Sequence, residues 1–80
     1  METKTEKLLG LVIRRTTWQI ESINRSLEQE KEDLVQEAQK GNANYVKQIC
    51  ARIEQLERDL TIYNSYKYEL EGIMKLEEKA

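Results

Sequence analysis

The chain has 80 residues, 35% of them charged, a net charge of −2, one cysteine, and neither proline nor histidine. A chain this short buries too little surface for an ordinary globular core, and the lone Cys50 cannot form an internal disulfide. Without histidine a zinc site lacks most of its usual ligands, and the acidic balance removes the electrostatic basis for strong nucleic-acid binding. Stability must therefore come from long helices, from association, or from both.

Nothing in the sequence indicates a membrane or a secreted protein. No apolar run approaches the roughly 18 residues of a membrane span, and the start Met1–Lys4 lacks the apolar core of a signal peptide. We therefore expect a cytoplasmic protein with a reduced thiol.

The first periodic segment predicts a helix over about residues 4–40, because apolar residues repeat at alternating spacings of three and four. Thr16 shares this heptad seam, and Glu30 is a polar break in it. The seam residues of the segment are Leu9, Ile13, Ile20, Ile23, Leu27 and Leu34.

A turn is predicted at residues 41–43. Gly41 follows Lys40, and a glycine just past a lysine in the final turn signals the end of a helix. Asn42 or Asn44 can then cap the second helix through its side-chain oxygen. The alternative is one continuous helix through Gly41, since glycine costs only about 1 kcal/mol inside a helix.

The second periodic segment predicts a helix over about residues 44–78, with Tyr63 and Met74 on its seam and Lys67 interrupting it. Its other seam residues are Val46, Ile49, Ile53, Leu56, Leu60 and Leu70. A short connection forces the helices antiparallel, so residues whose numbers add up to about 84 face each other. The predicted fold is all-α: a two-helix antiparallel coiled-coil hairpin, forming a single domain over residues 1–80.

The hairpin alone leaves one side of its seam exposed, so we expect a second layer that completes a helical bundle by dimerisation or by partner binding. Surplus apolar residues near the open end predict where that layer docks, since tryptophan and tyrosine are enriched at binding hot spots. The predicted partner interface consists of Leu11, Trp18, Ile62, Tyr66, Ile73 and Leu76. The alternative is a wide core face that the chain's own ends cover.

Signals for chemistry are few. A ferritin-like metal site needs Glu-x-x-His pairs, so the acidic run over residues 28–37 is interpreted as a solvated helix face. Cys50 follows the seam and lacks a basic histidine partner, which favours packing over catalysis. No glycine-rich phosphate loop or Ser/His/Asp arrangement occurs. We expect no catalytic residue, no metal site and no cofactor.

Two families share features with the chain. The first resemblance depends on the short N-terminal Glu/Leu segment, Gly41-Asn42-Ala43, Tyr45, Leu56-Glu57, and the pair Leu60 and Ile62. On these points the whole chain resembles the small E-type co-chaperones of type III secretion needle subunits. That resemblance implies a cytoplasmic hairpin that pairs with a TPR-like chaperone through helix 2 and keeps the needle subunit from polymerising. Helix 1 is longer here than in that family.

The second resemblance lies within residues 20–70. Its similar stretches are Leu27-Glu28-Gln29-Glu30-Lys31, Ala38-Gln39-Lys40-Gly41-Asn42 and Ile49-Cys50-Ala51-Arg52. They are similar to the first two helices of ESCRT-III membrane-remodelling subunits, whose first helix is strongly basic and whose chains continue through further helices.

The sequence thus favours a non-catalytic protein-interaction module, a small cytoplasmic chaperone or adaptor that shields a helical client such as a secretion needle subunit. Its expected partner is a helical protein or a TPR-like chaperone, and alone it should form a homodimer. Alternatives are an ESCRT-III-like assembly subunit, an RNA-binding hairpin dimer of the Rop kind, and a small phage- or plasmid-type regulator or inhibitor. The Rop-like alternative needs cations on one face of the bundle.

Overall fold

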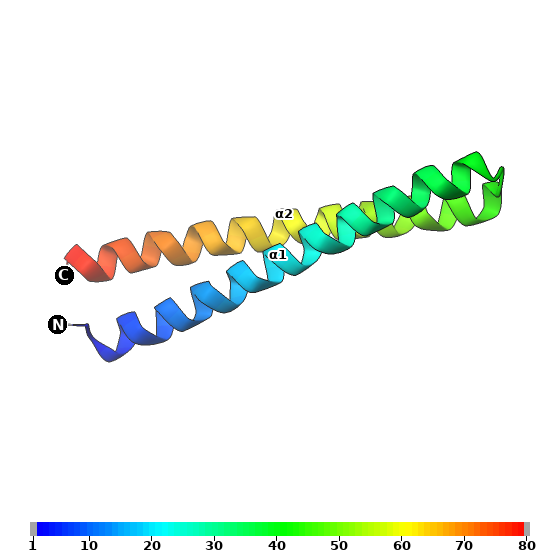
Figure 1. The fold of residues 1–80 in the computed structure, drawn as a ribbon. Helices are drawn as coiled ribbons and strands as arrows, with labels where there is room; N and C mark the ends of the chain where they lie inside the picture. Colours follow the sequence, from blue (N-terminus) through cyan, green and yellow to red (C-terminus); the bar gives the residue numbers. More distant parts are fainter. Residues whose placement is uncertain (1, 80) are drawn as a thin grey trace.

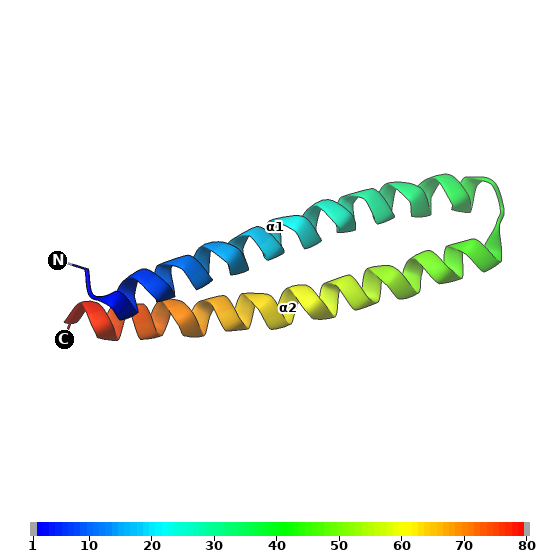
Figure 2. The same ribbon diagram turned by 90° about the horizontal axis from the view of Figure 1, so that it is seen from below.

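The chain folds as a hairpin of two long helices, in a computed structural model that describes residues 2–79. Helix α1 spans Lys4–Gln39 and α2 spans Ala43–Lys79. They lie side by side in opposite directions, with both chain ends at one end of a rod of 59 × 15 × 12 Å (Figures 1 and 2). The predicted antiparallel two-helix hairpin is confirmed, its bounds differ from those predicted by at most one residue, and the continuous helix through Gly41 is wrong.

Helix α1 begins with a capping box. The backbone N–H of Glu6 donates to Oγ1 of Thr3 at 3.1 Å, and the backbone N–H of Thr3 donates to Oε1 of Glu6 at 3.5 Å. These two bonds satisfy N–H groups that have no partner inside the helix. The Thr-x-x-Glu spacing is a sequence signal for this start that apolar periodicity does not reveal.

The turn between the helices depends on the backbone of Gly41, whose φ of 74° lies in the left-handed region. The N–H groups of Gly41 and Asn42 donate to the carbonyl oxygens of Ala38 and Glu37, both at 3.2 Å. This Schellman pattern ends α1. Asn42 then caps α2, because its Oδ1 accepts from the backbone N–H of Tyr45 at 3.4 Å.

The core between the helices is thin. Among the described residues four hydrophobic side chains are buried, Ile23, Leu27, Ile49 and Leu70, and only Ile49 is fully enclosed. All twelve predicted seam residues are buried or half-buried, while eleven large hydrophobic side chains remain exposed. Since apolar burial is the main stabilising contribution, the isolated hairpin has little stability of its own.

Polar residues interrupt the seam at defined places. Glu30, the break in the α1 pattern, accepts from Nε of Arg52 through both carboxylate oxygens, at 3.1 and 3.2 Å. The Arg52 guanidinium also lies over the ring of Tyr45, 5.7 Å from its centroid. Thr16 is buried and donates its hydroxyl to the carbonyl oxygen of Val12 at 2.9 Å. A break in apolar periodicity therefore marks a cross-helix ion pair at Glu30.

The bond to Glu30 raises the pKa of Arg52. A raised folded-state pKa means that the guanidinium contributes stability below its unfolded pKa, and that this contribution is lost only as the pH rises through the folded value. Arginine titrates far above neutrality, so this ion pair gives the hairpin no pH sensitivity through its arginine in the physiological range.

Candidate protein-binding face

Heptad positions place every residue around its helix. Ile13 of α1 and Val46 of α2 occupy position a, which puts the seam at positions a and d of both helices. Positions c and g follow each other at spacings of four and three, so they form a second stripe beside the seam. In an antiparallel pair the g positions of the two helices border the seam on the same side. The c and g residues of α1 and α2 therefore make up one flank of the rod.

Exposed apolar side chains gather on this flank near the open end of the hairpin. Two come from α1 and four from α2, and each of them occupies either position c or position g. They form the open-end apolar face: Leu8, Val12, Ile62, Tyr66, Ile73 and Leu76. Clustered exposed apolar side chains of this kind are typical of protein-interaction sites.

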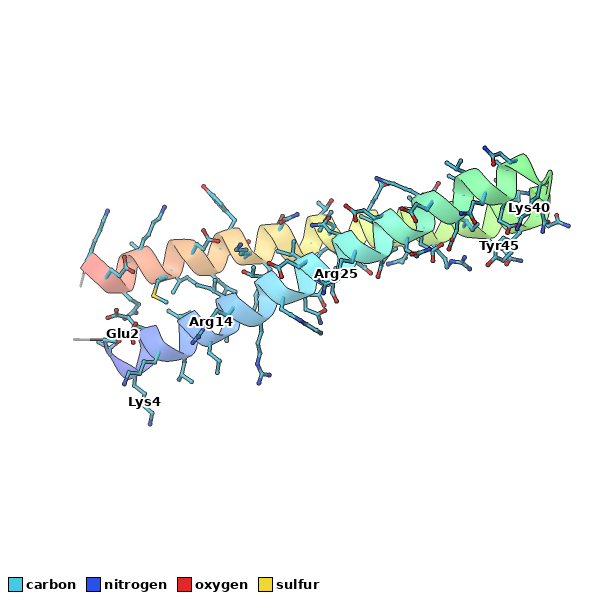
Figure 3. All side chains as sticks on the ribbon, in the orientation of Figure 1. Glu2, Lys4, Arg14, Arg25, Lys40 and Tyr45 are labelled. Atoms are coloured by element: carbon cyan, nitrogen blue, oxygen red, sulfur yellow. The ribbon has the colours of Figure 1, made fainter. Side chains whose placement is uncertain are left out.

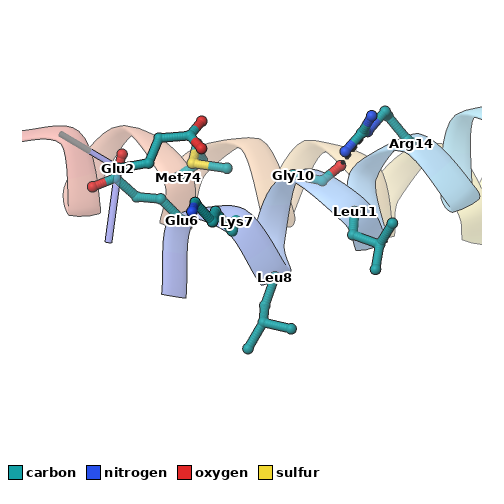
Figure 4. A pocket seen from close by; sticks show the side chains of 8 residues that line it. All are labelled: Glu2, Glu6, Lys7, Leu8, Gly10, Leu11, Arg14 and Met74. Carbon is teal, nitrogen blue, oxygen red and sulfur yellow. Dashed lines mark hydrogen bonds between the residues drawn. The ribbon is translucent and has the colours of Figure 1, made fainter. Parts of the chain in front are cut away.

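The face differs in part from the predicted partner interface. Four of the six predicted residues belong to it, and the other two, Leu11 and Trp18, occupy position f along its outer edge on α1. Trp18 is 59% exposed. Leu8 and Leu11 project to the same side of α1, away from α2 (Figure 4). The predicted partner interface did not include Leu8 and Val12. Their spacing of four, at positions c and g beside the seam, is the sequence signal that could have identified them.

One hollow lies on the face. It has a volume of about 370 Å³ and is lined by Asp59, Ile62, Tyr63 and Tyr66 on α2. Another hollow, of about 390 Å³, lies at the open end beside Met74, and its lining includes Lys7, Gly10 and Arg14 at positions b and e of the opposite flank (Figure 4). Shallow hollows between side chains on a helix surface are the sites into which the side chains of another helix insert.

Charged residues are interspersed with the apolar ones. Arg15 and Glu69 both occupy position c, both are exposed, and neither forms a salt bridge with another described residue. Asp59, at position g, accepts a hydrogen bond from Gln55 at 2.9 Å. Arg25 lies at position f near the middle of the rod, between Arg14 at the open end and Lys40 at the turn (Figure 3). Near the open end of this flank the cation Arg15 belongs to α1 and the carboxylate Glu69 to α2, whereas nearer the turn the flank carries Asp33 on α1 and Arg52 on α2.

The remaining exposed large residues lie elsewhere. Tyr68 of α2 is 81% exposed and Val35 of α1 is 58% exposed. Both occupy position b, on the opposite flank of the rod. Tyr45 lies near the turn and contacts Arg52. Tyr68 and Val35 stand apart from the open-end apolar face and serve as matched controls for it.

The described residues show no sign of a metal site or a membrane span. Within residues 2–79 no group of three or more carboxylate or thiol side chains is placed to hold a metal ion. Neither helix, over the same residues, combines the length and the apolar character needed to cross a membrane. Cys50 is half-buried and takes part in no disulfide.

Comparison of the chain with models of protein families, with characterised proteins and with solved structures finds no match.

Proposed function

We propose that the chain is a non-catalytic protein-binding module, a small chaperone or adaptor that covers an amphipathic helix of a client protein. The observation that supports this most directly is the open-end apolar face, where six apolar side chains from both helices remain exposed on one flank. Leaving such a surface in water carries a free-energy cost that a partner removes.

The spacing of the face fits a helix better than a loop or a strand. Its residues occupy only positions c and g of the heptad, at spacings of three, four and seven, a pattern that fits the ridges of another α-helix. The hollow beside Tyr66 on α2 can take one side chain of such a helix, and the Trp18 ring lies at the same height along the rod. Tryptophan and tyrosine are among the residues most enriched at binding hot spots.

A chaperone or adaptor role agrees with the thin core and the simple chemistry of the chain. The hairpin buries few apolar side chains of its own, so binding a client stabilises both partners together. Among possible clients, the resemblance to E-type co-chaperones favours a subunit of a type III secretion needle, bound in the cytoplasm with a TPR-like chaperone as co-partner.

The proposal is tested with two tyrosines on α2. Tagged wild-type chain, Tyr66→Ala and Tyr68→Ala are each used to capture proteins from the cells that encode the chain, and the captured proteins are quantified by mass spectrometry. Removing an aromatic hot spot costs about 2 kcal/mol, so Tyr66→Ala should retain at least about tenfold less client than wild type. Tyr68→Ala, on the opposite flank, should retain as much client as wild type.

Circular dichroism at the same concentrations should give the same helix content for all three chains. The captured client, co-expressed with the hairpin, should stay soluble when it precipitates alone. Equal capture by Tyr66→Ala and Tyr68→Ala would contradict the proposal, and so would a client that is equally soluble without the hairpin.

A further inference from the structure

The two helices contribute complementary halves to the open-end apolar face. Residues of α1 and α2 whose numbers add up to about 84 lie at the same height along the rod. By this rule Leu8 is level with Leu76, and Val12 is level with Ile73. Each apolar residue that α1 places on the face therefore has an apolar counterpart on α2 at its own height.

One pair of opposite charges on the same flank obeys the same rule. Arg15 of α1 is level with Glu69 of α2. Arg15 and Glu69 occupy the same heptad position, c, and neither has a salt-bridge partner among the described residues. At the open end the α1 side of the flank is thus matched to the α2 side in apolar character and in this pair of charges.

We propose that a second copy of the chain covers this flank, with both hairpins pointing in the same direction and α1 of each copy packed against α2 of the other. This inference rests on the proposed use of the face in protein binding and names the partner of the free protein. A two-fold axis along the rod preserves height, so it brings Leu8 of one copy onto Leu76 of the other. It also places Arg15 of each copy opposite Glu69 of its partner.

The reversed arrangement fits the same surface less well. If the two copies run in opposite directions and overlap at their open ends, Arg15 meets Leu11 of the partner and Glu69 meets the partner's Ile73. If they overlap over their full length, the apolar ends meet the polar half of the rod near the turn. Both reversed arrangements oppose charge to apolar surface, which the same-direction dimer avoids.

The dimer completes the second layer that the hairpin lacks. Four helices then enclose Val12, Tyr66 and Ile73 of both copies, and Trp18 covers the outer edge of each contact. A client helix of similar character would compete for the same flank, so the dimer is the resting form of the module and client binding separates the two copies.

The test uses charge reversal on separate chains, followed by sedimentation at matched micromolar concentrations. Wild type should sediment at twice the monomer mass of 9.5 kDa. In Arg15→Glu the homodimer contains two Glu–Glu contacts, and in Glu69→Arg it contains two Arg–Arg contacts. Replacing two attractive surface pairs by repulsive ones should raise the dissociation constant of each variant about tenfold or more.

Mixing the two variants distinguishes the arrangement. In the mixed dimer both contacts join opposite charges again, because Glu at position 15 of one chain meets Arg at position 69 of the other, and the native Arg15 meets the native Glu69. An equimolar mixture should therefore recover the wild-type dissociation constant. An attraction within one hairpin cannot be restored by mixing, so recovery reports contact between copies.

Two results would overturn the inference: a wild-type chain that remains monomeric throughout the micromolar range, or a dimer in which mixing the variants restores nothing. Neither result changes the expected difference in client capture between wild type and Tyr66→Ala. Failure of this inference is therefore distinguishable from failure of the proposed function. Circular dichroism should show the wild-type helix content in both variants. A weaker dimer then reflects loss of association and not unfolding of the hairpin.

Discussion

Gly41 is the residue on which the reversal of the chain depends. Its φ of 74° is unfavourable for any residue with a Cβ, although the space around it is open, with nothing within 4 Å of an added Cβ. Gly41→Ala should therefore lower the free energy of unfolding by about 1–2 kcal/mol through backbone strain alone. Urea unfolding followed by circular dichroism measures this loss at a fixed protein concentration.

Gly72→Ala is the control for that substitution. Gly72 lies inside α2 with ordinary helical geometry and open space around it, so alanine there should raise stability by about 0.5–1 kcal/mol. The two substitutions are chemically the same and should act with opposite sign. Equal effects at both positions would mean that the turn does not require the left-handed conformation.

At the scale of the element, α2 carries two stripes with different roles. Ile49 and Leu70 lie at position d and face α1, whereas Ile62 lies at position c on the exposed flank. Ile49 is 0% exposed and Ile62 is 64% exposed, so the same residue type occurs in the core and on the surface of one helix. This contrast permits a direct test of which stripe holds the hairpin together.

Ile49→Ala should destabilise the hairpin by about 2–5 kcal/mol, because it leaves a cavity where the side chain is fully enclosed. Ile62→Ala should change stability by less than about 0.5 kcal/mol at protein concentrations low enough to keep the chain monomeric. Thermal unfolding by circular dichroism under those conditions compares the two. A similar loss for both would mean that the flank belongs to the core of the hairpin.

How far the sequence predicts these elements depends on how local each signal is. The seam and the turn were predictable because apolar periodicity and a glycine after a helix act within a few residues. The membership of Leu8 and Val12 in the exposed face follows from the same seam, which assigns them to positions c and g, but apolar residues on several sides of α1 over residues 8–13 obscure that signal. The ion pair between Glu30 and Arg52 joins residues 22 apart and needs the register of the hairpin.

The whole molecule is a rod only two helices thick, 59 Å long and 12 to 15 Å across. Such a shape has a large surface for its volume, and each helix can bury at most one of its stripes within the hairpin. The fold does not need the second stripe, which explains how a chain of 80 residues supports both a defined structure and an exposed apolar face.

If a second copy covers that stripe, folding and association are coupled, and the melting temperature must depend on protein concentration. A rise of about a hundredfold in concentration stabilises the folded dimer by about 2.7 kcal/mol, which calorimetry or circular dichroism detects as a higher midpoint. Ile73→Glu places a carboxylate in the contact between copies and should abolish this dependence. Val35→Glu, on the opposite flank, should preserve it, and a concentration-independent midpoint for the wild-type chain would show that the hairpin folds without its partner.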